Sequence, residues 1–371
     1  MNAHYTQFAQ LKNDQQPIME MGNKSPSSPT YKHTLIDRLR TQISFDAACC
    51  TSVDPRTLLS TGAFTESGVE GIHSKLLEYE YLHDDIMKYD QLVREGQSIA
   101  TLHGSTQGQP DRSTRFRNVL QPAGFGDELR VPFMYKGSCW GFLTLFRHHG
   151  KPVFSTEEQQ LLEALAPSIA YHLRQTSIGV SPVPAMIMEH ELEPGVLTLS
   201  TQLTPLSSNI LAEQWLKLLR QQEGSHDGEL PAPVRAVSLR ALSTSTAPAR
   251  LCIPSADAGT PWVTIRATLL QGAREHMGEK QLAVWFEPAK ATDMLPLMAE
   301  IYSWTERERQ LVRLIVQGFS TKELASALHI TAYTVQDHLK AIFLKTEVSS
   351  RRELVWKVYI PDSINICKKD R

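Results

Sequence analysis

The strongest constraint on the fold is a short motif that occurs three times near the C-terminus. Thr305–Glu308, Ser320–Glu323 and Ser350–Glu353 each place Ser or Thr three residues before Glu. Such a capping box satisfies two backbone N–H groups that the first turn of a helix leaves unpaired. Each box is followed by apolar residues at helical spacing. The pattern therefore predicts an all-helical C-terminal part in which the helix starts are fixed.

The helices predicted in this part have the lengths and spacing of a helix-turn-helix. The first runs from about 306 to 317, and Gly318 after it suits a left-handed C-terminal cap. The second is short, from 321 to 328. A tight turn follows, and Thr331 caps a third helix that ends near Lys345. A short helix, a tight turn and a second helix are the parts of this DNA-binding unit.

The third predicted helix has one apolar and one polar face. The apolar stripe consists of Val335, Leu339, Ile342 and Phe343, and the polar face of Tyr333, Gln336, Asp337 and Lys340. A helix held by its apolar side leaves the other side free to enter a DNA major groove. There Gln can pair with adenine, Lys can reach guanine or phosphate, and Asp can accept from cytosine.

Residues 304–345, with Val348 and residues 350–354, resemble the LuxR-type four-helix DNA-binding domain. The resemblance implies that the third helix reads the bases and that a fourth, from about 351 to 359, serves for dimerisation. The implied base contacts are Tyr333, Thr334, Gln336, Asp337 and Lys340. The implied phosphate contacts are Ser320, Thr321, Lys322, Thr331, Lys345 and Arg351. The implied dimer contacts are Leu354, Val355 and Val358.

The distribution of charge agrees with a nucleic-acid partner at this end. Residues 298–371 hold 12 Lys and Arg against 9 Asp and Glu, whereas the rest of the chain holds 26 against 31. A local positive excess favours contact with a phosphate backbone. A second interpretation stays open, in which the helical bundle is an adaptor for protein contacts. We expect no enzyme and no cofactor, because the sequence lacks a phosphate-binding loop, a Gly-x-Ser-x-Gly elbow and a His-Glu-x-x-His motif.

The cysteines and the hydropathy bear on the compartment. The five cysteines are odd in number and irregularly spaced, which is typical of a reducing cytoplasm without disulfides or a zinc site. No segment approaches the roughly 18 consecutive apolar residues of a membrane span, and the N-terminus has no signal-peptide pattern. We expect a cytoplasmic protein with no membrane partner and no bound metal.

Residues 31–178 alternate between helical and strand patterns. Helical stripes cover residues 35–43 and 76–94. Two strand patterns, 128–135 and 138–146, flank the two-residue turn Lys136-Gly137 and predict a hairpin. A last helix begins at Ser155, which forms a fourth capping box with Glu158. Its apolar stripe is Leu161, Leu162, Leu165, Ile169 and Leu173.

This part is similar to a GAF domain in the segment 124–130, in the hairpin through Trp140-Gly141, and in the segment 154–158. The resemblance implies an antiparallel-sheet domain whose cavity binds an unknown small molecule or nothing. Three cysteines are candidates for chromophore attachment or are small buried hydrophobes: Cys49, Cys50 and Cys139. Three histidines are candidates for a metal site or are exposed loop residues: His103, His148 and His149.

Residues 185–290 resemble a PAS domain, in an opening segment (195–199, Asn209 and 213–216) and in closing strands at 262–270 and 282–286. An irregular stretch is expected over 224–233, and the polar surroundings of His226 and His276 argue against haem. Residues 1–30 are polar and predict a disordered tail, and Ser181–Pro184 predicts a linker.

These patterns together predict a multidomain α+β protein. GAF-like (31–178) and PAS-like (185–290) antiparallel-sheet domains precede an all-α four-helix LuxR-type domain (298–371). The expected function is transcription regulation by binding double-stranded promoter DNA as a homodimer. The first two domains are expected to sense a signal or to dimerise.

Overall fold

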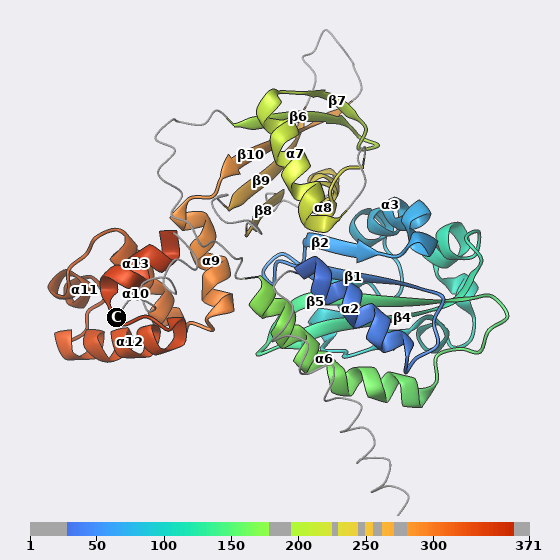
Figure 1. The fold of residues 1–371 in the computed structure, drawn as a ribbon, viewed down its shortest axis with the longest axis horizontal. Helices are drawn as coiled ribbons and strands as arrows, with labels where there is room; N and C mark the ends of the chain where they lie inside the picture. The colour runs from blue at the N-terminus through green and yellow to red at the C-terminus, as the bar shows by residue number, and fades with distance from the viewer. Residues whose placement is uncertain are drawn as a thin grey trace, which may run out of the picture. The chain divides into compact units, whose positions relative to one another are not determined.

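A computed structural model describes residues 28–177, 194–224, 229–243, 249–254, 262–270 and 280–359. It divides into two compact units. The first unit holds one five-stranded sheet with its helices and most of a second sheet, and the other unit holds the C-terminal helices (Figure 1). We call residues 28–176 the first domain, 194–288 the second domain and 290–359 the helical domain.

The sheet of the first domain has the strand order β2-β1-β5-β4-β3. Its strands are β1 (Ala47–Val53), β2 (Ser60–Thr65), β3 (Ala100–Thr101), β4 (Phe125–Tyr135) and β5 (Ser138–His148). The predicted hairpin is confirmed, because β4 pairs antiparallel with β5 up to Tyr135 opposite Ser138. Lys136 and Gly137 both have positive φ, 49° and 82°. Such a turn matches the right-handed twist of the two strands that it joins.

Helices pack on this sheet as their apolar stripes predict. They are α2 (Ser28–Arg40), α3 (Ser67–Leu82), α4 (Tyr89–Glu95), the one-turn α5 (Leu102–Ser105) and α6 (Thr156–Thr176), with short helical turns at Pro110–Arg112 and Phe116–Leu120. The helix α6 packs on β4 and β5, and α3 packs on β1. The capping box of α6 is confirmed, with Ser155 N–H donating to Glu158 at 2.8 Å and Glu158 N–H to Ser155 Oγ at 3.3 Å. The first domain thus has a sheet core closed by this C-terminal helix.

The prediction of a single helix over residues 76–94 is wrong. The chain leaves α3 after Leu82 and enters α4 at Tyr89, with Met87 between them at a φ of 64°. The Asp85 carboxylate accepts from Ile86 N–H at 2.7 Å, and Tyr89 N–H donates to Glu80 at 2.7 Å. These local hydrogen bonds compete with helical ones. The helical spacing of the apolar residues continues across the break, so the spacing did not reveal it.

The second domain contains another five-stranded sheet, in the order β7-β6-β10-β9-β8. Counted from each domain's own first strand, the order is the same in both sheets. The elements are β6 (Gly195–Ser200), β7 (Pro205–Ser208), α7 (Ile210–Glu223), α8 (Ala232–Leu242), β8 (Ala249–Ile253), β9 (Val263–Leu270) and β10 (Gln281–Pro288). Asn209 caps α7, since its side chain accepts from Ala212 N–H at 2.9 Å. The likeness to a PAS domain remains a prediction.

The irregular stretch predicted over 224–233 ends earlier than expected, because α8 begins at Ala232. Every side chain from Ala232 to Leu239 is buried, including Arg235. A helix buried on all sides has no amphipathic stripe, so sequence periodicity does not detect it. The predicted tail is also too long, because Ser28 already begins α2. The linker at 181–184, His226, His276 and Cys367 lie outside the described residues.

The helical domain consists of α9 (Ala291–Ile301), α10 (Glu306–Val316), α11 (Thr321–Ala327), α12 (Ala332–Thr346) and α13 (Arg351–Tyr359). The predicted boundary at residue 298 cuts α9, which packs against α10 and α13. In the described part of the chain, no helix is both long and apolar enough to cross a membrane.

Two glycines of the first domain give opposite predictions for the same substitution. A Cβ at Gly141 would lie 2.7 Å from Thr51 O, which is backbone in a paired strand, whereas Gly71 in α3 has open space around it. We expect Gly141→Ala to lower the free energy of unfolding by about 1–3 kcal/mol through overpacking. Gly71→Ala should raise it by about 0.5–1 kcal/mol. Urea denaturation of both variants tests this, and equal effects would contradict the packing of β5.

Candidate nucleic-acid interface and candidate ligand cavity

The helix starts of the helical domain have the predicted caps. Thr305 and Glu308 form a reciprocal capping box, as do Ser320 and Glu323. At the start of α13 the box is incomplete. Ser350 Oγ accepts from Glu353 N–H at 3.2 Å, but the Glu353 carboxylate accepts from the backbone of Ser349, at 2.7 Å, and not from that of Ser350.

The turns between these helices also agree with the sequence. Gly318 has a φ of 93°, and its N–H donates to Ile315 O at 3.0 Å, as expected of a left-handed cap. His329 closes α11 at a φ of 52°, and Ile330 N–H donates to Ala325 O at 3.0 Å. Thr331 Oγ1 accepts from Thr334 N–H at 3.1 Å and so caps α12. These turns set the position of α12 relative to α11.

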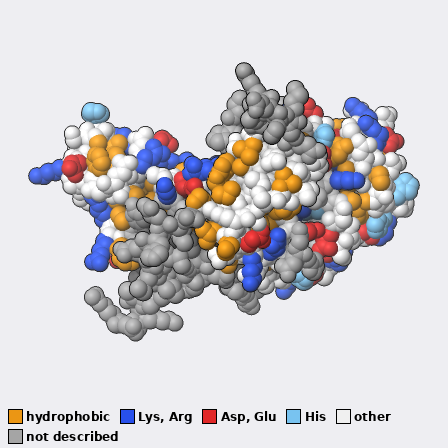
Figure 2. Space-filling view, turned by 90° about the horizontal axis from the view of Figure 1, so that it is seen from above, with side chains coloured by type: hydrophobic (Ala, Val, Ile, Leu, Met, Phe, Trp, Pro, Cys, Tyr) orange, Lys and Arg blue, Asp and Glu red, His pale blue; other side chains and the backbone are white. Residues whose placement is uncertain are grey.

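The two faces of α12 differ sharply in exposure. Val335, Leu339 and Ile342 are buried against the other helices, whereas Tyr333 is 74% exposed. Gln336, Asp337 and Lys340 are exposed as well. Lys340 Nζ lies 3.4 Å from Asp337 Oδ1, and such an exposed pair is weak enough to be exchanged for contacts with DNA. Figure 2, which views the molecule from above, shows Lys and Arg side chains among Asp, Glu and hydrophobic side chains on the visible surface of this domain, on the left. One face of α12 is therefore open to a groove.

Some of the residues predicted to bind phosphate already have partners in the protein. Lys345 Nζ donates to the buried Glu308 carboxylate at 2.6 Å and to Ser303 O at 3.1 Å. Arg351 donates to Phe319 O. The side chains of Lys322 and Thr331 are exposed, and Thr334 is half-buried beside the cap. Lys345 and Arg351 thus hold helices together in the free protein, which the sequence did not indicate.

The residues of α13 that were predicted for dimerisation differ in how deeply they are buried. Leu354 and Val358 are fully buried within the described part of the chain, and Val355 is half-buried. Trp356, by contrast, is 44% exposed. Leu354 and Val358 therefore belong to the domain core, and a second copy that approached α13 would meet Trp356.

The Glu308 carboxyl makes the helical domain sensitive to acid. Burial raises its pKa, but the hydrogen bonds from Lys345 and from Thr305 N–H outweigh burial, so the pKa lies below its ordinary value. A carboxyl with a lowered folded pKa stabilises above its unfolded pKa, about 4.3, and this contribution is lost as pH falls through the folded pKa. We expect Glu308→Gln to lower the melting temperature at pH 7, with the gap to wild type closing below pH 4. Glu306→Gln, on the exposed side of α10, is the control. A gap that does not depend on pH would contradict the role of this carboxylate.

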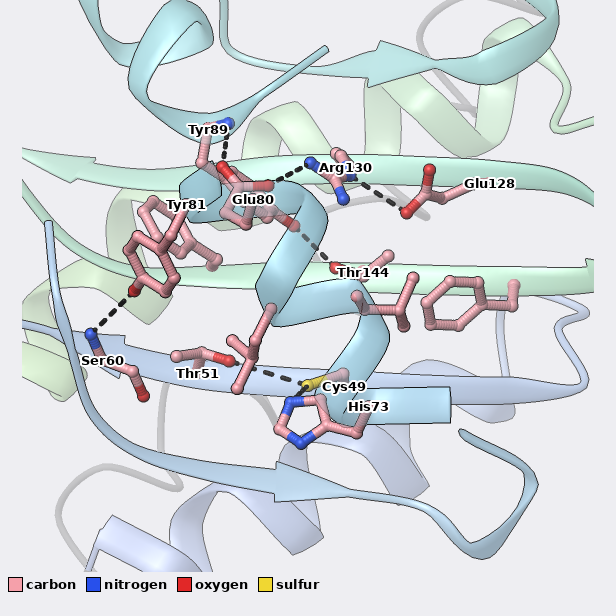
Figure 3. Close-up of a pocket in the computed structure, with 14 residues that line it drawn as sticks. Cys49, Thr51, Ser60, His73, Glu80, Tyr81, Tyr89, Glu128, Arg130 and Thr144 are labelled. Atoms are coloured by element: carbon pink, nitrogen blue, oxygen red, sulfur yellow. Dashed lines mark hydrogen bonds and ion pairs between the residues drawn. The ribbon is translucent and has the colours of Figure 1, made fainter. Parts of the chain in front are cut away.

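The first domain contains a cavity of about 50 Å³ between α3, α4 and the sheet (Figure 3). One end of it is charged. Arg130 donates to Glu80 at 2.8 Å and to Glu128 at 3.0 Å, and it lies over the ring of Tyr89. The other oxygen of Glu128 accepts from the fully buried Arg115 at 2.5 Å. Because Arg130 is paired with two carboxylates, it offers no free positive charge to an anion.

The other end of the cavity is polar but uncharged. It is lined by Cys49, Ser60, His73 and Tyr81, and Figure 3 shows the ring of His73 beside Cys49. The Ser60 hydroxyl is buried and has no hydrogen-bond partner among the described residues. Burial raises the pKa of the Cys49 thiol. Cys49, Cys50 and Cys139 are all buried thiols, and His103, His148 and His149 are exposed. The described residues hold no cluster of three or more potential metal ligands.

The chain matches two family models. Residues 302–358 match the family described as bacterial regulatory proteins of the luxR family, and residues 34–173 match the GAF domain. Residues 302–358 are therefore a LuxR-type helix-turn-helix domain, and residues 34–173 are a GAF domain, as the sequence predicted.

Relatives and solved structures cover parts of the chain. The response regulator protein VraR of Staphylococcus aureus is 42% identical over 74 residues, which are 19% of this chain and 35% of the relative; VraR of Staphylococcus epidermidis matches equally. The chain thus spans about a third of the length of these relatives. The GAF domain of an Acinetobacter phosphoenolpyruvate-protein phosphotransferase is 14% identical with a TM-score of 0.29, and covers 44% of this chain and 92% of its own. The Vibrio cholerae VqmA dimer, described as a LuxR-type receptor, is 14% identical with a TM-score of 0.20. The match covers 45% of this chain and 82% of the VqmA chain.

Proposed function

We propose that this protein is a sequence-specific DNA-binding transcription regulator. The observation that carries the proposal is the exposed polar face of α12, backed by buried Val335, Leu339 and Ile342, inside a LuxR-type domain. In this proposal Gln336, Asp337 and Lys340 contact bases, with Tyr333 and Thr334 beside them. Lys322 and the start of α11 contact the phosphate backbone, with Ser320, Thr321 and Thr331 nearby.

We propose further how the protein assembles and receives its signal. The protein acts in the cytoplasm as a homodimer, which places two recognition helices about one DNA turn, roughly 34 Å, apart. The GAF domain and the second domain regulate DNA binding and catalyse no reaction. In this proposal the domains have limits near 31–178 and 185–290, and the C-terminal domain begins at α9. The cavity beside α3 supports a small-molecule signal.

The salt dependence of DNA binding tests this function. The full-length protein is titrated with promoter fragments from its own genome at several salt concentrations. A regulator that contacts phosphates loses affinity linearly on a logarithmic scale as salt rises, and it binds some fragments far better than others. A helical domain that serves as a protein adaptor would bind no fragment at any salt concentration.

A further inference from the structure

A buried arginine of the second domain reaches into the first domain. Arg235 on α8 donates from Nη2 to His73 Nδ1 at 3.2 Å and from Nη1 to Ser74 Oγ at 3.2 Å. Arg235 is only 9% exposed and His73 only 7%. Both His73 and Ser74 lie on α3, the helix that covers the cavity. The hydrogen bond therefore joins the second domain to a side chain in the cavity wall.

This contact determines which nitrogen of His73 carries the hydrogen. A guanidinium group only donates hydrogen bonds, so His73 Nδ1 must accept, and in the neutral ring the hydrogen is then on Nε2. His73 Nε2 lies 3.8 Å from Cys49 Sγ, which is a weak acceptor. Burial first, and the charge of Arg235 second, lower the pKa of His73 to about 3. The ring is thus neutral at cellular pH and presents a poorly used donor to the cavity.

Other contacts show that the second domain is seated on the same part of the first. The half-buried Glu223 carboxylate at the end of α7 accepts from Ala63 N–H on β2 at 3.3 Å. Arg240 on α8 donates to Thr57 O at 3.3 Å. The helix α8 packs on both α3 and β2. Arg240 also lies over the ring of Tyr81 in the cavity wall, 5.9 Å from its centroid, but Arg235 is the member of this set that hydrogen-bonds to a cavity residue.

The lining of the cavity limits what it can hold. A cavity of 150 Å³ accepts benzene, so about 50 Å³ suits a compound of roughly two or three non-hydrogen atoms. An anion would meet the carboxylates of Glu80 and Glu128, and Arg130, the cation of the lining, is already bound to both. A neutral compound would find the donor of His73 and the unpartnered hydroxyl of Ser60.

We propose that Arg235 of the second domain completes this cavity by holding His73 as a donor for a small uncharged hydrogen-bond acceptor. Occupancy of the cavity and docking of the second domain then stabilise each other, because the occupant binds the docked arrangement better than the undocked one. Arg235 is a positioning residue in this scheme, and His73 is the residue that contacts the occupant. The inference deepens the sensing part of the proposed function. The experiment below measures His73 and not DNA binding. The inference can therefore fail while the proposed function holds, and the proposed function can fail while the inference holds.

The experiment uses the full-length protein labelled with ¹⁵N-histidine. The signal of His73 is identified by its loss in His73→Asn. Nuclear magnetic resonance then reports which ring nitrogen carries the hydrogen, in wild type and during titration with formamide. Formate, which has the same number of non-hydrogen atoms but a negative charge, is the matched control ligand. We expect the hydrogen on Nε2 and a saturable shift of the Nε2 signal with formamide, but no such shift with formate.

Two variants of α8 then test the role of the second domain. Arg235→Met keeps the length of the side chain but removes its donors, and we expect it to weaken formamide binding roughly fivefold to tenfold, the effect of one hydrogen bond. Arg240→Met removes an arginine of the same helix that donates to Thr57 O and lies over the ring of Tyr81, but makes no hydrogen bond to His73. It should change the affinity less than about twofold.

Three results would overturn the proposal. The first is a titration in which formate shifts the His73 Nε2 signal as much as formamide does, or in which formamide gives no saturable shift. Another is an equal loss of affinity in both arginine variants. If Arg235→Met does not fold, wild type alone decides. A His73 ring that protonates with its ordinary pKa of about 6.5, or that carries its hydrogen on Nδ1, contradicts the contact with Arg235.

Discussion

Replacing Gln336 and Lys340 together by alanine should lower the affinity for a specific operator by about 100-fold, with little change in folding. Each well-placed contact between a side chain and a base edge contributes about 1–3 kcal/mol of discrimination, and the two positions lie one turn apart on the exposed face of α12. Both side chains are exposed, so their loss leaves no cavity and no buried group without a partner. Competition binding with labelled operator DNA measures the change.

The matched control for this variant is Arg313→Ala. Arg313 is an exposed residue on α10. Its replacement by alanine removes one positive charge, as the change at Lys340 does. It should weaken binding by less than about threefold, mainly through the smaller long-range attraction to DNA. Equal losses in the two variants would mean that net charge, and not the face of α12, determines binding.

Replacing Glu128 by alanine should be the most destabilising change in the GAF domain. Its carboxylate accepts from Arg115 and Arg130, and all three side chains are almost completely buried. Removing the shared anion leaves two buried guanidinium groups with one partner fewer, and breaking such a network costs about 3–5 kcal/mol. Chemical denaturation followed by tryptophan fluorescence measures the loss, since Trp140 lies in this core.

An exposed ion pair of the same domain provides the comparison. Arg94 Nη2 lies 3.0 Å from Asp90 Oδ2 on the surface of α4, with most of the Arg94 side chain in solvent. Arg94→Ala should lower the free energy of unfolding by less than about 0.5 kcal/mol. If Glu128→Ala cost no more than this control, the buried network would not hold the first domain together.

The helical domain was predictable from sequence because its signals are local. A cap such as Thr305 with Glu308, or the left-handed Gly318, is read within four residues. The stripe of α12 repeats over four turns and separates the buried Val335 from the exposed Gln336. The hairpin around Lys136-Gly137 was predictable for the same reason, because two residues determine its geometry.

The parts that sequence reasoning missed depend on contacts between distant residues. Arg235 meets His73 across 162 residues of chain, and Lys345 meets Glu308 across 37. No periodicity in the sequence predicts such pairs, and a charged residue within an apolar stretch gives no indication of its partner. The helix α8 was missed because the side chains from Ala232 to Leu239 are all buried, which removes the amphipathic pattern. The resemblance to a GAF domain implied a cavity, but most of its lining was not predicted, because the lining residues come from strands and helices that are distant in sequence.

Genome-wide immunoprecipitation of the tagged full-length protein, beside the Gln336→Ala, Lys340→Ala variant, tests the central claim most directly. A sequence-specific regulator should give sharp peaks in intergenic regions that share a sequence with two-fold symmetry, and the variant should lose them. The symmetry of that sequence would also report the dimer. Residues 290–371 are expressed alone as a second sample. In this fragment the GAF domain and the second domain cannot keep the helical domain off DNA when the cavity is empty. Uniform background for both the full-length protein and this fragment would contradict the proposal that α12 reads DNA.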